Sequence, residues 1–397
     1  MSLWSIVLLG ACFCVAAQQA HAGAKPLLET DFTSDPLQDG WTQVGPGGHA
    51  FAGRWVAGES PDHITVSQGW WESPSLPVKP FAYYDLKFRF KTSEKGYVAA
   101  IFLDSEGKAL QSDTYDSLYP APDWQDQELC FRAYPLAVKV QIRFQAITTP
   151  VDVARVSLHQ GDTIGTARWA ESVMAADPPL HYTPPTDLAA QLPRTAAALR
   201  HGRSLRIVLL GDSIANDTGC SLFETLLHHR FPHCRVEVVN STRGGTSCIW
   251  YQHENRVESY VLQFHPDLLI IAGISHGYDS EAIRSVIRQV RAISNPEIMV
   301  LSDVITPQTL MESSFVRDSH LPEAEALERI RSYPEGLAQM TREEKVALLD
   351  IRTPWNAYIQ SSPQPQDWFM RDAIHASSRG KQVVGHMLAM ALEKVAG

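Results

Sequence analysis

Two different hydrophobic patterns divide this sequence and constrain what it can fold into. Between residues 27 and 159, apolar and polar residues alternate, as in Tyr84–Lys91 and Val138–Gln145. This period of two predicts strands with one buried and one solvated face, and therefore an antiparallel β-sandwich over residues 27–160. From Leu205 onward, short apolar runs alternate with helical patterns. That alternation predicts an α/β fold with a parallel sheet and flanking helices.

The predicted parallel sheet has five strands. They are expected at Leu205–Leu210, Arg235–Val239, Leu268–Ala272, Ile298–Leu301 and Val346–Leu349. Apolar spacing predicts one helical face over Ile283–Ile293 and a final helix over Ser378–Val395. A proline-rich linker at residues 161–203, with a short helical stretch near Leu188–Leu199, is expected to separate the sandwich from an α/β domain at 204–397.

Residues 1–22 have the pattern of an export signal. Leu3–Ala17 is almost wholly apolar, and Ala20-His21-Ala22 offers small residues at the two positions that a signal peptidase recognises. We therefore expect cleavage after Ala22 and a secreted or periplasmic protein. A rival interpretation makes Cys12 the lipidated cysteine of a lipoprotein. No later segment approaches the ~20 apolar residues needed to span a bilayer.

The charge balance narrows the classes of partner. The formal net charge is −10, and no basic block interrupts it. Nucleic-acid partners are therefore not expected, because Lys and Arg drive their binding. The three histidines near one predicted helix end, His228, His229 and His233, are interpreted as solvated side chains. With no paired CxxC spacing either, we expect no metal.

Four cysteines follow the predicted signal. They are Cys130, Cys220, Cys234 and Cys248. A disulfide among the last three and a set of small buried apolar side chains are equally compatible with their positions, because export permits disulfides and free cysteines are commonly buried.

Three strand ends carry residues suited to chemistry. Gly211-Asp212-Ser213 follows the first predicted strand, Asn240–Thr246 the second and Gly273–Gly277 the third. In open parallel sheets, ligands bind at the carboxyl ends of the strands. Far downstream, Asp372 and His375 stand three residues apart. A serine, an imidazole and a carboxylate are the parts of an activated hydroxyl nucleophile.

On these motifs, the segment from Leu205 to Gly397 resembles the SGNH/GDSL hydrolase superfamily, which carries Gly-Asp-Ser after its first strand and Asp-x-x-His near its C-terminus. The resemblance implies an SGNH-like (flavodoxin-like) fold and acyl-ester hydrolysis without a cofactor. It implies that Ser213 is the nucleophile, that His375 is the general base and later acid, and that Asp372 orients the imidazole.

The family's oxyanion hole maps less simply onto this sequence. Its second motif implies a glycine N–H, and counting from Asn240 selects Gly245, with Gly244 as its neighbour. Its third motif supplies an asparagine that is missing here. Alignment on Gly273 places Ser275 at that position, whereas alignment on Pro266 places His276 there. Both side chains can donate a hydrogen bond, and His276 is our first choice.

The sandwich half is rich in tryptophan. It contains Trp41, Trp55, Trp70, Trp71 and Trp124. We expect about half or more of these rings in the core. Because Trp70 and Trp71 are adjacent, one of them must point outward from a strand, where it would form a platform for a sugar ring. Several secreted carbohydrate esterases resemble this arrangement, with a sandwich like a carbohydrate-binding module ahead of an SGNH-like domain.

The leading functional hypothesis is an exported serine esterase that removes acyl groups, acetyl first among them, from an acylated polysaccharide or oligosaccharide. A lipase, thioesterase or acyltransferase with the same Ser213 site is an alternative within enzymes. A glycan-binding protein without activity is the alternative from another class. The sequence does not determine the glycan or the oligomeric state.

Overall fold

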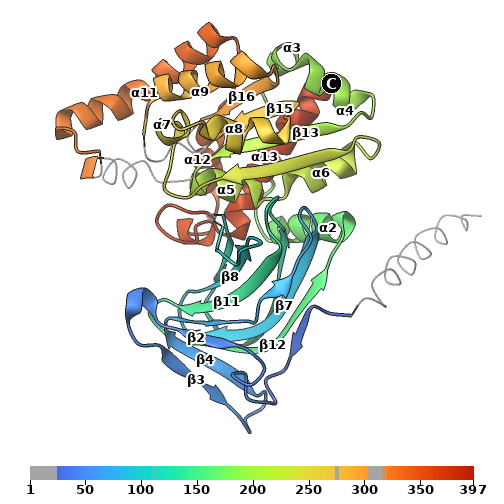
Figure 1. Ribbon diagram of the computed structural model, residues 1–397, viewed down its shortest axis with the longest axis vertical. Coiled ribbons are helices and arrows are strands. Elements are labelled where there is room, and N and C mark those ends of the chain that lie inside the picture. The colour runs from blue at the N-terminus through green and yellow to red at the C-terminus, as the bar shows by residue number, and fades with distance from the viewer. Residues whose placement is uncertain (1–24, 111, 273–276, 303–315, 318) are drawn as a thin grey trace, which may run out of the picture.

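The computed structural model describes residues 25–110, 112–272, 277–302, 316–317 and 319–397. The chain forms an antiparallel β-sandwich below an α/β domain, and the two parts are in contact (Figure 1). The predicted export signal, its cleavage site after Ala22 and the alternative at Cys12 lie outside the described residues. Among the residues described, no helix is long and apolar enough to cross a membrane.

The sandwich consists of two six-stranded sheets. Sheet A contains β10 (Ala121–Arg132), β7 (Tyr83–Thr92), β12 (Val151–Gln160), β4 (His63–Gln68) and β3 (Ala52–Val56) in that order, with β1 (Leu28–Thr30) also paired to β12. Sheet B contains β2 (Thr42–Val44), β5 (Trp70–Glu72), β11 (Lys139–Ala146), β8 (Gly96–Leu103) and β9 (Thr114–Leu118), with β6 (Leu76–Pro77) also paired to β11. A single 3-10 turn, η1 (Pro46–Gly48), follows β2.

The alternating pattern produces this sandwich as predicted. Phe88 from β7 and Phe144 from β11 are buried, with ring centroids 5.1 Å apart, so the inner faces of sheets A and B meet. The polar partners in each strand point the other way. One expected inward residue, Val138, precedes β11 and is 37% exposed, because the strand begins only at Lys139.

The C-terminal sheet has five parallel strands, which confirms the predicted α/β class. Their order is β14 (Val236–Thr242), β13 (Leu205–Gly211), β15 (Leu268–Ile271), β16 (Glu297–Leu301) and β17 (Ala347–Leu349). This order places the second strand outside the first, as in flavodoxin-like sheets. Leu209 and Leu210 point to opposite faces and are both fully buried, each in a separate hydrophobic cluster. Both faces of the sheet are therefore covered.

Helices cover the two faces of this sheet. In chain order they are α5 (Ser213–Gly219), α6 (Phe223–Arg230), α7 (Cys248–Tyr251), α8 (Arg256–Tyr260), η2 (Leu262–Phe264), α9 (Ser280–Ile293), α11 (Glu323–Glu344), α12 (Arg352–Ser361), η3 (Gln366–Trp368) and α13 (Ser378–Ala396). The predicted helical face in α9 is buried through Ile283, Val286 and Val290.

The segment between the two patterns is more ordered than the predicted linker. It contains α2 (Thr163–Met174), α3 (Leu188–Gln191) and α4 (Pro193–Arg200). Asp162 caps α2 by accepting a hydrogen bond from Gly165 N at 2.7 Å, and the Trp169 indole donates to Glu128 O at 3.0 Å. Helix α2 thus packs on the sandwich. The domain limits at 160 and 204 remain our proposal.

The sandwich covers the open edge of the parallel sheet. Strand β14 lies at the end of the sheet, so its outer backbone groups have no neighbouring strand. The Arg132 guanidinium donates to Val238 O, and the Ser112 hydroxyl donates to Thr242 O at 2.7 Å. Two carbonyls of the edge strand are therefore satisfied by side chains of the other domain, which joins the two domains along this edge.

Candidate active site

Ser213 stands at the first turn of α5, directly beyond β13, which lies next to the edge strand β14. A Cβ atom at Gly211 would lie 1.8 Å from Ala272 O, so only glycine fits where the chain leaves the strand. The buried Asp212 carboxylate then accepts hydrogen bonds from the backbone of Ile214 at 2.8 Å and Ala215 at 3.2 Å. This cap begins the helix and leaves the half-buried Ser213 at the carboxyl end of the sheet.

The three residues predicted from the distant motifs lie together. His375 Nε2 is 2.9 Å from Ser213 Oγ, and His375 Nδ1 is 2.9 Å from both carboxylate oxygens of Asp372. A carboxylate can only accept a hydrogen bond, so Nδ1 carries the proton and Nε2 is left to accept from the serine hydroxyl. This is the arrangement that activates a serine as a nucleophile.

The loop that carries the acid and base is held by its own backbone. Asp372 Oδ1 accepts from Ile374 N and His375 N, each at 2.9 Å, so the carboxylate faces the imidazole of its own turn. Arg371 N donates to His375 O at 2.8 Å, which closes the turn from the other side. The spacing of three residues therefore fixes the acid relative to the base within a single turn.

Arg371 is a charged neighbour that the motifs did not indicate. Its Nε lies 3.2 Å from Asp372 Oδ2, its side chain is 11% exposed, and its guanidinium lies 4.9 Å from the centre of the Tyr115 ring. Burial raises the pKa of Asp372, but the hydrogen bond and charge of His375, together with the charge of Arg371, lower that pKa well below its ordinary value. Asp372 is therefore ionised at neutral pH, where its charge can stabilise the protonated imidazole.

The predicted oxyanion donors are only partly described. Gly245 is exposed in the turn after β14, with φ of 68°, a conformation that favours glycine. Its neighbour Gly244 is half-buried in the same turn. Ser275 and His276 lie outside the described residues.

Residues 209–383 match the model of the GDSL-like Lipase/Acylhydrolase family. The C-terminal domain is a GDSL-like acylhydrolase domain. The matched segment includes both Ser213 and the Asp372–His375 turn. No curated protein matches the sequence.

Similar solved structures cover different parts of the chain. A two-domain esterase active on acetylated mannans is 17% identical, with a TM-score of 0.39 over 52% of this chain and 53% of that chain. The enzymatically active domain of tailspike protein 4 from bacteriophage CBA120 is 16% identical, with a TM-score of 0.27 over 33% of this chain and 20% of that one. A xylan-binding domain from Paenibacillus barcinonensis is 14% identical, with a TM-score of 0.26 over 35% of this chain and 96% of that domain. The chain thus spans about half the length of the esterase and about a fifth of the tailspike chain.

The two predicted sugar-contacting tryptophans have different environments. Trp71 is fully buried in the sandwich core, so the prediction of a sugar contact is wrong for this residue. Trp70 is half-buried on the outer face of sheet B, where the Arg143 guanidinium lies 4.3 Å from its ring centre. Alternation along β5 therefore leaves Trp70 as the candidate.

The cysteines described in the structure are free thiols, and all four are buried. Of the two alternatives left open for Cys220, Cys234 and Cys248, the structure supports small buried side chains. Cys220 touches the domain interface, with its sulfur 3.5 Å from Thr114 Oγ1.

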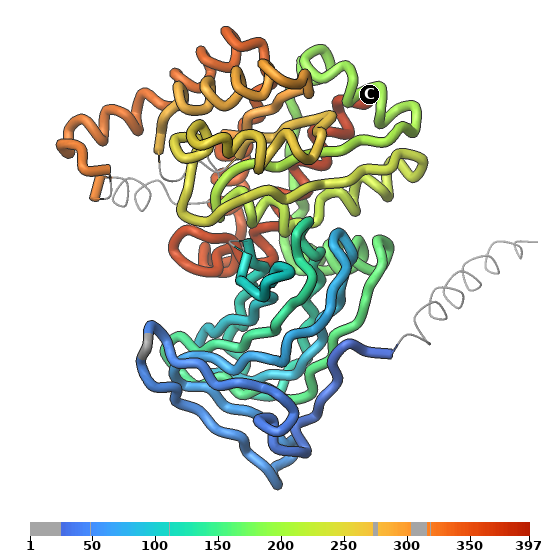
Figure 2. The backbone as a smooth tube through the Cα atoms, in the orientation of Figure 1, coloured from blue at the N-terminus to red at the C-terminus, as the bar shows by residue number. Residues whose placement is uncertain are grey.

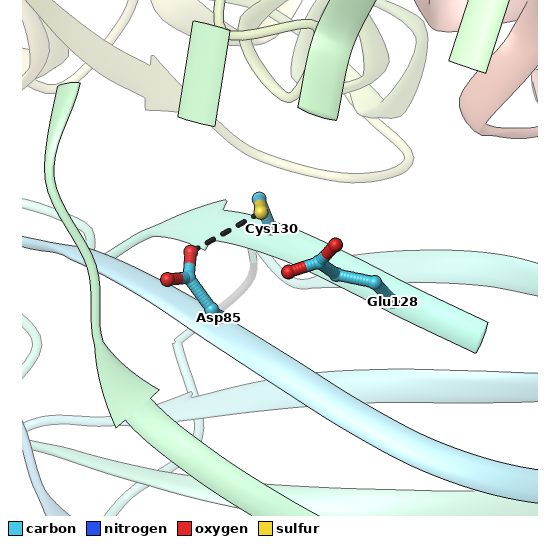
Figure 3. A group of neighbouring side chains, drawn as sticks. All are labelled: Asp85, Glu128 and Cys130. Atoms are coloured by element: carbon cyan, nitrogen blue, oxygen red, sulfur yellow. Dashed lines mark hydrogen bonds between the residues drawn. The ribbon is translucent and has the colours of Figure 1, made fainter. Parts of the chain in front are cut away.

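One cluster outside the GDSL-like domain has metal-ligand residue types. Asp85, Glu128 and Cys130 have ligand atoms within 4.8 Å of one another on sheet A (Figure 3). The Cys130 thiol donates to Asp85 Oδ1 at 3.2 Å, and burial followed by the Asp85 charge raises the pKa of this thiol far above its usual value. Glu128 also pairs with Lys87 at 3.3 Å. The hydrogen bond between Cys130 and Asp85 and the ion pair between Glu128 and Lys87 account for these side chains, and we assign no metal role to the cluster.

Proposed function

We propose that this protein is an exported serine esterase that hydrolyses acyl esters, acetyl esters first among them, on an acylated polysaccharide or oligosaccharide. The observation that carries the proposal is the unbroken hydrogen-bond chain from the Asp372 carboxylate through His375 to Ser213 Oγ, with 2.9 Å at each step. That chain lies in the GDSL-like acylhydrolase domain and at the edge of the sheet where ligands bind.

In the proposed mechanism, Ser213 Oγ attacks the ester carbonyl carbon while His375 Nε2 takes its proton. The tetrahedral oxyanion then collapses, the bond to the sugar oxygen breaks, and His375 returns the proton to that oxygen. In the second half, water attacks the acyl-Ser213 ester while His375 takes its proton. The bond to Ser213 Oγ then breaks, His375 returns the proton to that oxygen, and the carboxylic acid leaves. Asp372 stabilises the imidazolium in both halves. We assign the oxyanion contacts to Gly245 N–H and to His276 or Ser275.

A carbohydrate substrate is supported by the outer face of sheet B. Strand pairing places Trp70, Gln145 and Tyr97 in one row across this face. In the next row Arg143 binds the Glu72 carboxylate through Nε at 3.1 Å and Nη2 at 2.7 Å. Aromatic rings beside fixed polar groups suit sugar rings, which have an apolar face and polar edges.

The same face leads to the active site. The Tyr97 hydroxyl donates to Arg371 O at 3.2 Å, and Tyr115, in the row of Arg143, has its ring against the Arg371 guanidinium. Arg371 in turn contacts Asp372. A saccharide that contacts Trp70 would therefore have a continuous polar and aromatic surface as far as the acid of the triad.

The test is acetate release from acetylated xylan and acetylated mannan by the purified full chain. Ser213→Ala should abolish release and labelling by a fluorophosphonate probe, whereas Ser204→Ala, an exposed serine just before β13, should leave both unchanged. Preferred release of octanoate from a long-chain ester would favour a lipase. Saccharide binding without labelling or turnover would instead identify a non-catalytic glycan-binding protein.

A further inference from the structure

Asp372 and His375, the acid and base of the proposed triad, belong to a loop whose two ends are joined by backbone contacts. The loop leaves η3, and an isolated bridge pairs Met370 with Ala376. Immediately below that bridge, Ser377 N donates to Phe369 O at 3.0 Å. The Asp372–His375 turn lies between these joined ends. The position of the imidazole therefore depends on the position of residues 369–377.

The sandwich contacts the start of this loop from outside the GDSL-like domain. Lys95 lies in the turn between β7 and β8, and its ammonium donates to Asp367 O at 3.1 Å and Met370 O at 3.0 Å. Two residues further on, the Tyr97 hydroxyl donates to Arg371 O at 3.2 Å. The loop lies directly against the sandwich in the backbone view, where it is drawn in red (Figure 2). Lys95 of the turn and Tyr97 of β8 therefore bind three backbone carbonyls, one in η3 and two in the loop.

Further contacts from the strand β9 region fix both ends of the loop. The Tyr119 hydroxyl donates to Trp368 O at 2.5 Å, where the loop begins. The Asp116 carboxylate accepts from Ser378 N at 2.8 Å, where α13 begins. Between these ends, the buried Asp217 of α5 accepts from Ala376 N at 2.9 Å. The loop is thus held between the nucleophile's own helix on one side and the sandwich on the other.

We propose that Lys95 is a positioning residue for the catalytic imidazole, and that the sandwich is for this reason part of the active site as well as a carbohydrate-binding surface. The inference rests on the proposed esterase function. The Lys95 ammonium binds one carbonyl in η3 and one in the loop, and it therefore restrains the position of the loop relative to the sandwich. This restraint is strong because a charged donor makes stronger hydrogen bonds than a neutral one. A misplacement of about 1 Å at a catalytic group can cost ~100-fold in rate.

The test replaces Lys95 by methionine, which keeps the length of the side chain and removes its donors. We expect kcat for an acetyl ester to fall about 10- to 100-fold and KM to change less than about threefold, because the loop moves and the substrate surface does not. Labelling of Ser213 by a fluorophosphonate should slow in proportion to kcat. Lys95→Arg, which can still donate to two carbonyls, should recover most of the rate.

Two further variants separate positioning from stability and from the function itself. Lys87→Met removes an exposed lysine of sheet A that pairs with Glu128, and it should leave kcat unchanged. Tyr97→Phe removes one hydroxyl and should lower kcat severalfold at an unchanged melting temperature, which decides the matter if Lys95→Met is unstable. Wild-type kcat in both Lys95→Met and Tyr97→Phe, with Ser213→Ala inactive, would overturn the positioning role. An active Ser213→Ala would instead overturn the proposed function.

Discussion

Ser213 and His375, the proposed nucleophile and its proposed base, are positioned by different parts of the molecule. Ser213 is placed within a few residues, because Gly211 lets the chain leave β13 and Asp212 caps the helix that follows. His375 is placed by a loop whose supports come from far away in the sequence, since Lys95 and Met370 are 275 positions apart. The first half of the site is therefore a product of one strand–helix unit, and the second half depends on how the two domains pack.

This difference indicates which substitutions should affect each half of the site. A change near Ser213 alters the strand–turn–helix unit itself, where Gly211, Asp212 and Ile214 are buried. A change at Lys95 or Tyr97 leaves the Gly211 turn and the Asp212 cap intact but alters the loop whose imidazole must meet Ser213 at 2.9 Å. Variants of the second kind should thus lower turnover before they lower the integrity of the α/β domain.

The largest effect should come from the acid of the loop half. We expect Asp372→Asn to lower kcat about 10,000-fold at neutral pH, because an amide no longer holds the imidazole in the required tautomer. KM should change little. Steady-state kinetics on an acetyl ester measure both quantities, and Asp123→Asn, at an exposed position of the sandwich, is the matched control. Activity within tenfold of wild type would exclude Asp372 from the triad.

The next largest effect, on stability, is expected at the buried ion pair that lies beneath the loop. Lys381 and Asp217 are each about 98% buried, with Nζ and Oδ1 3.5 Å apart, and Lys381 also donates to Tyr115 O of the sandwich. Lys381→Met should destabilise the full chain by ~3–5 kcal/mol, since it leaves a buried carboxylate without its counter-charge. Denaturant unfolding checks the value.

Two comparisons make this test specific. Lys394→Met, at an exposed position of the same helix, should change stability by less than ~0.5 kcal/mol. The double variant Lys381→Met/Asp217→Asn should be less destabilised than the sum of its single changes. Strict additivity would mean that the two side chains do not interact.

The pH dependence of the unfolding free energy should reveal the contribution of Asp372 in the loop. Because the folded pKa of Asp372 is lowered, the folded state binds fewer protons than the unfolded state as the pH falls below the ordinary aspartate value of about 4. The stability that Asp372 contributes is thus complete above that pH and is lost as the pH falls toward the folded pKa. The difference in unfolding free energy between wild type and Asp372→Asn should shrink from pH 7 to pH 3. A difference that stays constant would contradict the lowered pKa.

The smallest effect should come from the sugar-contacting face. Trp70→Ala should raise KM for an acetylated polysaccharide about 2- to 10-fold and leave kinetics on a small acetyl ester unchanged, because an aromatic contact contributes ~0.5–1.5 kcal/mol. Trp124→Ala, which removes a half-buried indole from the opposite sheet, is the control. Equal effects of the two changes would remove the assignment of Trp70.

Much of the fold follows from periodicity. Four of the five parallel strands begin and end within one residue of their predicted bounds, and β14 extends three residues beyond its predicted end, because a buried strand reads as an unbroken apolar run. Helix α2 was missed beside the prolines that follow it, although Asp162 is a typical cap for it. The adjacent pair Trp70–Trp71 was correctly predicted to have one outward ring, but the inward ring could be assigned to Trp71 only from the register of β5 on β11.

The residues of the proposed triad could be predicted because a serine nucleophile requires particular side chains at particular motifs. Its supports could not be predicted, because Lys95, Tyr97 and Tyr119 all donate to backbone carbonyls. A carbonyl is present at every residue, so such an acceptor leaves no trace in the sequence. Arg371 was missed for a related reason, since a charged residue before the motif is also compatible with an exposed loop.

By itself, the sequence determined the two fold classes and singled out Ser213, Asp372 and His375 as the candidate triad, because hydrophobic period and side-chain chemistry are local properties of the chain. Only the tertiary structure decided that the sandwich covers the open edge of β14 and holds the loop of the catalytic base. Those contacts join surfaces distant in sequence, and they exist only after each domain has buried its own core and presented its edge to the other.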